Sequence, residues 1–149
     1  MIKSEYEIKR NIKEIDELIS SGYKQAYCWL NGNYIKLDNY FIKEDGSFLR
    51  KYKYDKVGKW LDGGIVKPQK RKDGYIQVKV RVDNKRYVLK LHRIVASTFL
   101  TKSEFDTEVN HKDMCKENNH VSNLEWCNHK HNMLHYFGGV NSGEMEGEN

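Results

Sequence analysis

A histidine and three asparagines are the residues of this 149-residue chain whose order could support chemistry. His111 follows Asn110 at the end of a short apolar stretch, and Asn123 and Asn132 come 12 and 21 residues after the histidine. A neutral imidazole titrates near physiological pH and can act as a general base. Amide oxygens are hard ligands that suit a cation such as Mg²⁺. One base beside one such cation can hydrolyse a phosphodiester, because the base activates water and the cation neutralises charge on the phosphate.

Around these residues the sequence resembles the HNH (His-Me finger) endonucleases, in particular the branch of phage and intron-encoded homing enzymes. The resemblance extends from His92 to about Tyr136 and includes the segments VNHKD, NNHVSNLEW and HNMLH. Each segment alone is a weak motif, but their order and spacing together are specific. The resemblance implies a ββα-metal module that cleaves DNA with one Mg²⁺ or Mn²⁺ ion per active site and leaves 5′-phosphate and 3′-hydroxyl ends.

The same resemblance implies a role for each residue. His111 is the general base, Asn110 and Asn132 are the metal ligands, and His135 is a further candidate for the metal. Asn123 holds the loop and orients His111 through a backbone contact. Neighbouring residues of a strand point to opposite faces, so Asn110 can face the metal while His111 faces the attacking water. His92, at the start of the preceding helix, is expected to be structural.

Asn110 is a departure from the family pattern, because many members carry an aspartate there. An amide brings no negative charge, so we expect weaker metal binding in the absence of DNA. Asp113 could compensate in part, although its position also fits turn chemistry. This departure motivates a first alternative, a catalytically impaired HNH-fold protein that binds DNA without cutting it.

Two cysteines in the same histidine-rich segment motivate a second alternative, a zinc-stabilised nucleic-acid-binding domain. Its ligands would be Cys115 and Cys127, completed by His120, His129 or His131. Zinc sites usually contain cysteine pairs two to four residues apart, and this chain has none. An odd total of three cysteines, with no secretory signal in Met1–Arg10, also argues against a disulfide framework. Reduced, buried thiols are the expected state.

The positive charge of the chain is concentrated before the motif. Residues 43–93 carry sixteen basic and six acidic side chains, and the whole chain has a net charge of +5. Such a region attracts a polyanion, since lysine and arginine release counterions when they neutralise phosphates. Together with the resemblance to DNA-cleaving enzymes, this charge makes double-stranded DNA the expected partner.

The clearest strand pair lies inside this basic region. Apolar residues alternate with polar ones over residues 76–82 and again over 87–91, with Asp83-Asn84 as the turn. A period of two places the apolar side chains on one face and a basic set on the other. A two-stranded ribbon of this kind fits the major groove of B-DNA. The residues expected to contact DNA are Lys79, Arg81, Arg86 and Lys90.

Local patterns predict the remaining elements. An amphipathic packing helix is expected over residues 4–21, ending at Gly22, and turns at 31–33 and 44–47. Residues 53–65 and 68–74 are expected to be loops, and 92–100 a buried helix. The segment 109–111 should pair with 121–126, and Asn128 should cap a final helix to about Phe137.

Together these patterns predict an α+β protein. The expected parts are a helix and β-rich DNA-binding region over 1–91, an HNH nuclease module over 92–137 and a disordered acidic tail over 138–149. No apolar stretch approaches the roughly 20 residues of a membrane span. We therefore expect a soluble cytoplasmic protein encoded by a phage or mobile element. It should act as a monomer, without a membrane or a small-molecule cofactor.

Overall fold

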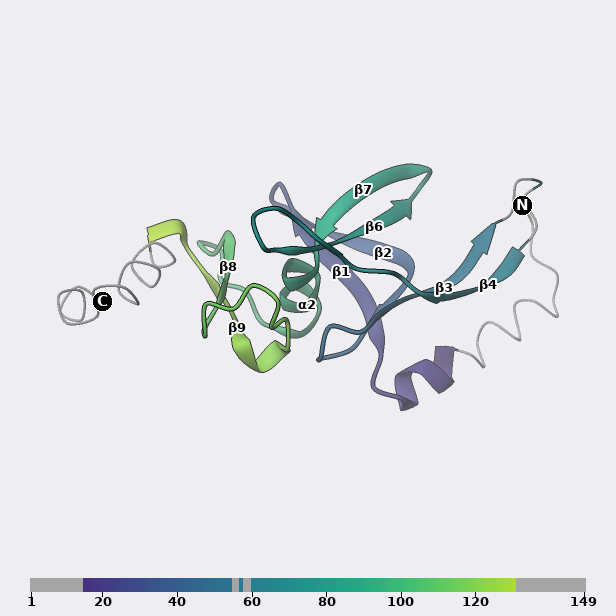
Figure 1. Cartoon of the computed structure of the whole chain (residues 1–149), viewed down its shortest axis with the longest axis horizontal. Coiled ribbons are helices and arrows are strands. Elements are labelled where there is room, and N and C mark those ends of the chain that lie inside the picture. Colours follow the sequence, from purple (N-terminus) through teal and green to yellow (C-terminus); the bar gives the residue numbers. More distant parts are fainter. Residues whose placement is uncertain (1–14, 55–56, 58–59, 131–149) are drawn as a thin grey trace.

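The protein has an α+β fold in which one buried helix separates a small hairpin from two larger sheets (Figure 1). The computed structural model describes residues 15–54, 57 and 60–130. The four-stranded antiparallel sheet has the order β1 (Lys24–Leu30), β2 (Asn33–Ile42), β3 (Phe48–Tyr54) and β4 (Trp60–Ile65). The three-stranded sheet contains β5 (Gln69–Lys70), β6 (Ile76–Val82) and β7 (Lys85–Lys90). Helix α2 (Leu91–Phe99) leads to β8 (Glu108–His111), the 3₁₀ turn η1 (Val121–Asn123) and β9 (Leu124–Cys127).

The predicted hairpin turns are confirmed by their backbone angles. Asp83 and Asn84, between β6 and β7, have φ of 50° and 63°, as a two-residue turn of the primed type requires. Asn31 and Gly32 have φ of 49° and 88° between β1 and β2. Between β2 and β3 the turn contains Gly46 at φ 90°. Asparagine, aspartate and glycine tolerate these left-handed conformations better than other residues do.

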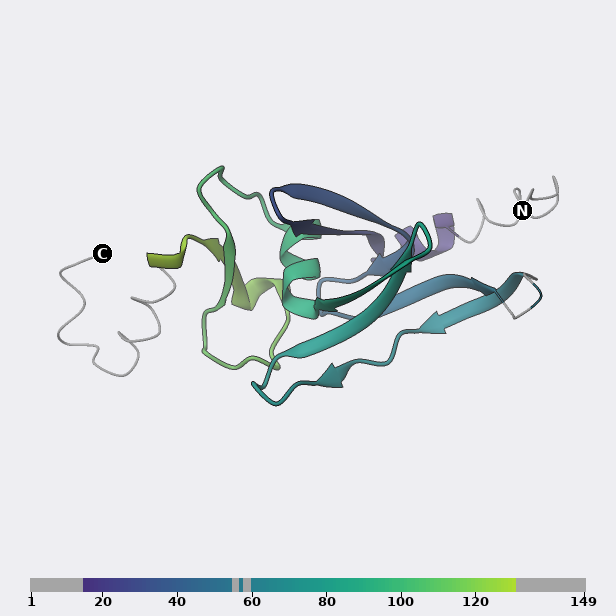
Figure 2. The ribbon, with the colours of Figure 1, turned by 90° about the horizontal axis from the view of Figure 1, so that it is seen from above.

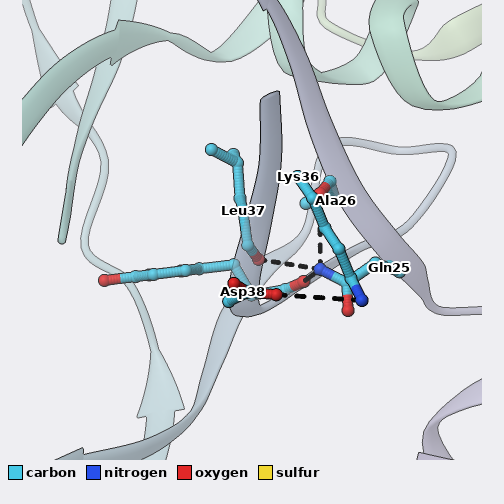
Figure 3. A network of polar contacts seen from close by, with 6 residues as sticks. Gln25, Ala26, Lys36, Leu37 and Asp38 are labelled. Carbon is cyan, nitrogen blue, oxygen red and sulfur yellow. Dashed lines mark hydrogen bonds and ion pairs between the residues drawn. The ribbon is translucent and has the colours of Figure 1, made fainter. Parts of the chain in front are cut away.

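An irregularity in β1 and β2 is held together by side-chain amides. The register of β1 against β2 shifts between Gln25 and Tyr27. There the Gln25 Nε2 donates a hydrogen bond to the backbone oxygen of Leu37 at 2.7 Å (Figure 3). It also donates to the backbone oxygen of Tyr40 at 3.1 Å. Asn39, at φ 74°, accepts a hydrogen bond from the Tyr52 N–H at 2.8 Å. These bonds replace the ladder bonds that the irregularity removes.

Helix α2 forms the centre of the core. Ile94, Val95 and Ala96 are fully buried, and the helix contacts β1 as well as the β8–β9 hairpin. Figure 2 shows α2 lying between that hairpin and the larger sheets. Because β1 is an edge strand, its N–H groups need partners. The Ser97 hydroxyl accepts from the Trp29 N–H at 2.9 Å, and Thr98 accepts from Tyr27 at 3.0 Å.

The N-terminal helix is seen only in part. Residues 15–20 are helical and end at Gly22, whose φ of 95° confirms the predicted cap. The Tyr23 N–H donates to the Leu18 oxygen at 3.0 Å, as in a Schellman motif. The helix was predicted to pack through an apolar face, yet Ile19 is 57% exposed. The rest of the predicted helix lies outside the described residues.

Two predicted loops were wrong. Within residues 53–65, β3 continues to Tyr54 and β4 spans Trp60–Ile65, and the segment 68–74 contains β5. Sequence alternation could not reveal β4, because its pairing depends on β3 and on a glycine. A Cβ at Gly63 would lie 1.7 Å from the Arg50 backbone oxygen, so the two strands approach more closely there than any other residue allows.

Candidate active site

The predicted pairing of residues 109–111 with 121–126 is confirmed by the β8–β9 hairpin. Asn110 pairs with Glu125 and His111 with Leu124. Val109 and Leu124 are 5% and 2% exposed, so the hairpin is anchored in the core through apolar side chains. Asn110 and His111 are themselves 7% and 5% exposed. Buried polar groups of this kind need hydrogen-bond partners, and those partners define the chemistry of the site.

The partner of His111 is Asn119. The His111 Nε2 lies 2.8 Å from the Asn119 Oδ1, and both side chains are buried. An amide oxygen can only accept, so Nε2 must carry the proton of the imidazole. The lone pair is therefore on Nδ1, which is the nitrogen able to accept a proton.

Asn119 is itself held by the turn between β2 and β3. A Cβ at Gly46 would lie 3.6 Å from the Asn119 Cβ, so the turn packs against this asparagine. The Val121 N–H donates to the Glu44 oxygen at 2.8 Å. The four-stranded sheet thus supports the loop that orients His111. The sequence contained Asn119 within the motif, but gave no indication that its side chain would face the histidine.

His111 lies in a cluster of three rings. The His92 ring is tilted against the His111 ring at a centroid distance of 4.7 Å, and the Tyr75 ring stacks on His92 at 5.1 Å. Burial lowers the pKa of His92 well below its ordinary value, and His111, Arg93 and Lys90 lower it further. Burial also lowers the pKa of His111, although the Asn119 hydrogen bond opposes this. Both imidazoles are therefore neutral near pH 7, which a general base requires.

Asn123 fastens the loop after His111. Its Oδ1 accepts from the Asp113 N–H at 3.1 Å, and its Nδ2 donates to the Asp113 Oδ1 and the Asn118 oxygen, each at 2.9 Å. Asp113 also accepts from the Cys115 N–H at 2.8 Å and the Asn118 amide at 2.9 Å, and these hydrogen bonds lower its pKa. Asp113 is thus engaged in turn chemistry. The Asn123 amide contacts the loop, and Asn119 is the residue that contacts the His111 ring.

Asn110 fits the metal-ligand assignment in one respect. Its Nδ2 donates to the Glu125 Oε1 at 2.9 Å, which leaves its Oδ1 as the free end of the amide. Among the described residues that buried oxygen accepts no hydrogen bond, and a hard cation is a suitable partner for it. Glu125 also places a carboxylate beside Asn110. The negative charge missing at Asn110 is therefore present one strand away, a contact that the sequence did not predict.

The predicted basic face is confirmed in its geometry. In the β6–β7 hairpin Arg81 pairs with Arg86 and Lys79 with Val88, while Val78, Val80, Val82 and Leu89 are buried on the opposite face. We call the set Lys79, Arg81, Arg86 and Lys90 the basic face. Lys79, Arg81 and Arg86 are exposed, and Lys90 is partly buried.

Tyr75 connects the basic face to His111. The Lys90 Nζ lies 4.5 Å and the Lys116 Nζ 4.6 Å from the centre of the Tyr75 ring, and that ring lies 6.0 Å from the His111 ring. Lys116 also donates to the Asp73 backbone oxygen at 2.7 Å, which ties the loop before β6 to the loop after His111.

Asn132, His135 and most of the predicted final helix lie outside the described residues, and their predicted approach to the metal stays a prediction. Residues 129–130 are helical, directly after Asn128.

His129 is exposed and its Nδ1 lies 2.8 Å from the Glu108 Oε2, and His120 accepts from the Ser122 N–H at 3.1 Å. Cys28 and Cys127 are buried and Cys115 is exposed. Within residues 15–54, 57 and 60–130, no three His, Cys, Asp or Glu side chains come together to hold a metal.

His111 ends a strand of the β8–β9 hairpin, and this hairpin packs against the buried helix α2. This arrangement is that of the ββ part of an HNH module, and sequence comparison supports the HNH class. The chain is 34% identical over 125 residues to an uncharacterised HNH endonuclease of Acanthamoeba polyphaga mimivirus, covering 84% of this chain and 34% of that protein. It is 37% identical over 71 residues to the DNA endonuclease I-HmuI of Bacillus phage SP01, covering 48% of this chain and 41% of that enzyme. No family model matches the chain.

Structural comparison agrees. A solved structure of the HNH homing endonuclease I-HmuI, described as binding and cleaving DNA, matches with a TM-score of 0.54 and 28% identity, over 70% of this chain and 54% of the other. The chain is therefore a homologue of the HNH endonucleases. In the sequence alignments it spans about a third of the length of the first mimivirus relative and 41% of I-HmuI. Among the described helices, none is long and apolar enough to cross a membrane.

Proposed function

We propose that this chain is a metal-dependent endonuclease of the HNH homing type that hydrolyses a phosphodiester of double-stranded DNA. The observation that carries the proposal is the buried His111, whose Nε2 is engaged by Asn119 at 2.8 Å and whose Nδ1 is left with the lone pair. The likeness to a DNA-cleaving HNH homing endonuclease supports the choice of substrate.

In this mechanism His111 removes a proton from the attacking water at Nδ1. Asn119 keeps the proton on Nε2 and holds the ring plane, and the adjacent ring of His92 limits its rotation. A fixed imidazole contributes more than a mobile one, because the reacting atoms are then already aligned. General-base catalysis of this kind typically contributes ~10²–10⁴-fold to the rate.

A divalent cation, Mg²⁺ or Mn²⁺, would be held by Asn110 and Asn132, with His135 as a further candidate. When bound, it would neutralise charge on the phosphate and on the leaving oxygen. Glu125 fixes the Asn110 amide through Nδ2 at 2.9 Å, so that the carbonyl oxygen is the end available to a ligand. Its carboxylate also adds negative charge to a ligand set that is otherwise neutral.

The DNA would lie along the basic face and reach His111 past Tyr75. Lys79, Arg81, Arg86 and Lys90 are positioned to neutralise phosphates, and Lys90 and Lys116 flank the ring that leads to the histidine. We propose that residues 1–91 supply most of the binding and 92–137 the chemistry, and that a monomer suffices to cut one strand. The chain would be virus-encoded, in keeping with its viral relatives.

The test is cleavage of supercoiled plasmid by the purified chain with Mg²⁺ or Mn²⁺. We expect conversion to relaxed circles, no conversion in EDTA, and an activity that co-purifies with the wild-type chain but is lost in His111→Ala. Binding of plasmid without cleavage under every metal condition would contradict the proposal, and would favour the catalytically impaired DNA-binding alternative.

A further inference from the structure

A hollow of about 320 Å³ lies where the four-stranded sheet meets β6, away from His111. The residues that matter here are Tyr40 of β2, Arg50 of β3, Gly63 and Gly64 of β4, Lys67 after β4, and Lys79 of β6. Three of these six carry a positive charge and none carries a negative one. We call this feature the cationic hollow.

The three cations of the hollow are uncompensated. Some lysines and arginines elsewhere on the surface have carboxylate partners, as Lys70 has in Glu117 at 3.3 Å and Arg71 in Asp73 at 3.1 Å. By contrast, the side chains of Arg50, Lys67 and Lys79 make no ion pair or hydrogen bond within the described part of the chain. Three positive charges that line one hollow without a negative charge beside them favour the binding of an anionic ligand.

A buried hydroxyl adds an unused donor. Tyr40 is 2% exposed, and its ring is fixed by stacking on Phe48 at a centroid distance of 5.4 Å. Its oxygen accepts a hydrogen bond from the Arg81 N–H at 3.0 Å. The proton of that hydroxyl has no acceptor among the described residues. A buried donor that lacks a partner is costly, and an oxyanion in the hollow would satisfy it.

The two glycines of β4 differ in what surrounds them. A Cβ at Gly63 would collide with the Arg50 backbone oxygen, so this position brings β3 and β4 together. At Gly64 an added Cβ would meet no atom within 4 Å, so glycine is not required there for packing. A side chain at Gly64 would therefore extend into space beside the three cations.

We propose that the cationic hollow binds a backbone phosphate of double-stranded DNA, an inference that rests on the proposed function. Continuity with the basic face favours DNA over a free anion. Lys79 belongs to both surfaces, and the Arg81 backbone is bonded to Tyr40. A phosphate seated here would extend the DNA contact from β6 to β3 and β4. Charge-assisted hydrogen bonds from Arg50 and the lysines would hold it.

The experiment measures binding of a fluorescein-labelled duplex of mixed sequence, in EDTA, by fluorescence anisotropy across a salt series. Arg50→Gln and Lys67→Gln each remove one charge from the hollow. Lys36→Gln is the charge-matched control, because Lys36 already pairs with Asp38 at 3.8 Å. Gly64→Glu introduces a negative charge, and Gly64→Gln controls for its size. Thermal melts establish that each variant is folded.

We expect Arg50→Gln and Lys67→Gln to weaken duplex binding by about three- to tenfold and to reduce the log–log salt slope by up to roughly 0.9, the value for one phosphate contact. Lys36→Gln should change affinity by less than about twofold, as expected for an exposed charge that already has a partner. Gly64→Glu should bind clearly more weakly than Gly64→Gln. The inference is overturned if the hollow variants bind as their controls do.

Two further results separate the possible explanations. If inorganic phosphate shifts the amide resonances of Gly63 and Gly64 while the variants bind duplex normally, the hollow takes a small anion, and the DNA assignment is wrong. Plasmid cleavage by the wild-type chain is scored independently. A chain that does not cut, but loses duplex binding through Arg50 and Lys67, would retain this inference while the proposed nuclease function fails.

Discussion

In the β8–β9 hairpin and its loop, His111, Asn119 and Asn123 are buried and bonded to one another or to the loop backbone. On the basic face, Lys79, Arg81 and Arg86 are exposed, and within the described residues their side chains have no partner. The difference follows from what each region must do. A group that acts on water has to be oriented before the substrate arrives, whereas a group that neutralises phosphate gains its partner from the DNA.

This comparison divides the expected effects of mutations into two classes. Changes in the buried loop should reduce the rate of cleavage at saturating DNA and leave affinity nearly unchanged. Changes on the basic face should reduce affinity and its dependence on salt. The following predictions probe that division.

Replacing Lys79, Arg81, Arg86 and Lys90 together with Gln should have the largest effect on binding. Each lost phosphate contact should lower the log–log salt slope by up to roughly 0.9. The measurement is the equilibrium constant for duplex binding over a salt series in EDTA. An unaltered slope would place the DNA on another surface. The basic face would then not be the region that binds phosphate.

Asn119→Leu should affect the rate. Loss of the acceptor for the Nε2–H leaves the ring free to change tautomer, so we expect single-turnover cleavage at saturating DNA to slow about tenfold to hundredfold, part of the ~10²–10⁴ that a general base supplies. Asn119→Asp retains an acceptor and should recover much of the rate. The ¹⁵N chemical shifts of His111 report the tautomer directly. If Asn119→Leu cleaves at the wild-type rate and leaves the His111 ¹⁵N shifts unchanged, Asn119 does not position the base.

Asn110→Asp should have the smallest effect. It should favour metal binding but destabilise the metal-free protein. With Mg²⁺ the added charge should lower the concentration needed for half-maximal cleavage by about three- to tenfold. Without metal the new carboxylate would face Glu125, whose Oε1 is 2.9 Å from the Asn110 amide nitrogen, so the melting temperature should fall. Glu125→Gln removes the neighbouring charge and should raise the metal requirement. A metal requirement that moves in neither variant would remove Asn110 from the ligand set.

The sequence predicted those parts of the fold whose signals are local. The turn at Asp83-Asn84, the alternation of β6 and β7, and the helix that begins at Leu91 each follow from a short run of neighbouring residues, and all are confirmed. Strand β4 was missed because a lysine- and glycine-rich stretch becomes a strand only when β3 is beside it. Its pairing is a long-range contact with no periodic signature in the sequence.

The site was predictable in its residue types but not in its contacts. The spacing of Asn110, His111 and Asn123 identified the motif, since a motif is a property of the sequence. The contacts of Asn119 with His111 and of Glu125 with Asn110 depend on how the loop folds and how β9 pairs. The ring cluster joins His111 to His92 and to Tyr75, which lie 19 and 36 residues earlier in the chain.

The most direct test of the separation between chemistry and binding is to measure cleavage and duplex affinity on the same His111→Ala protein. Removal of the imidazole should slow single-turnover cleavage by ~10²–10⁴-fold, since the general base is lost. Duplex affinity in EDTA should stay within about twofold of wild type, because His111 is 5% exposed and the phosphate-binding cations lie on other elements. Cleavage at the wild-type rate, or a loss of affinity as large as the loss of rate, would contradict the account.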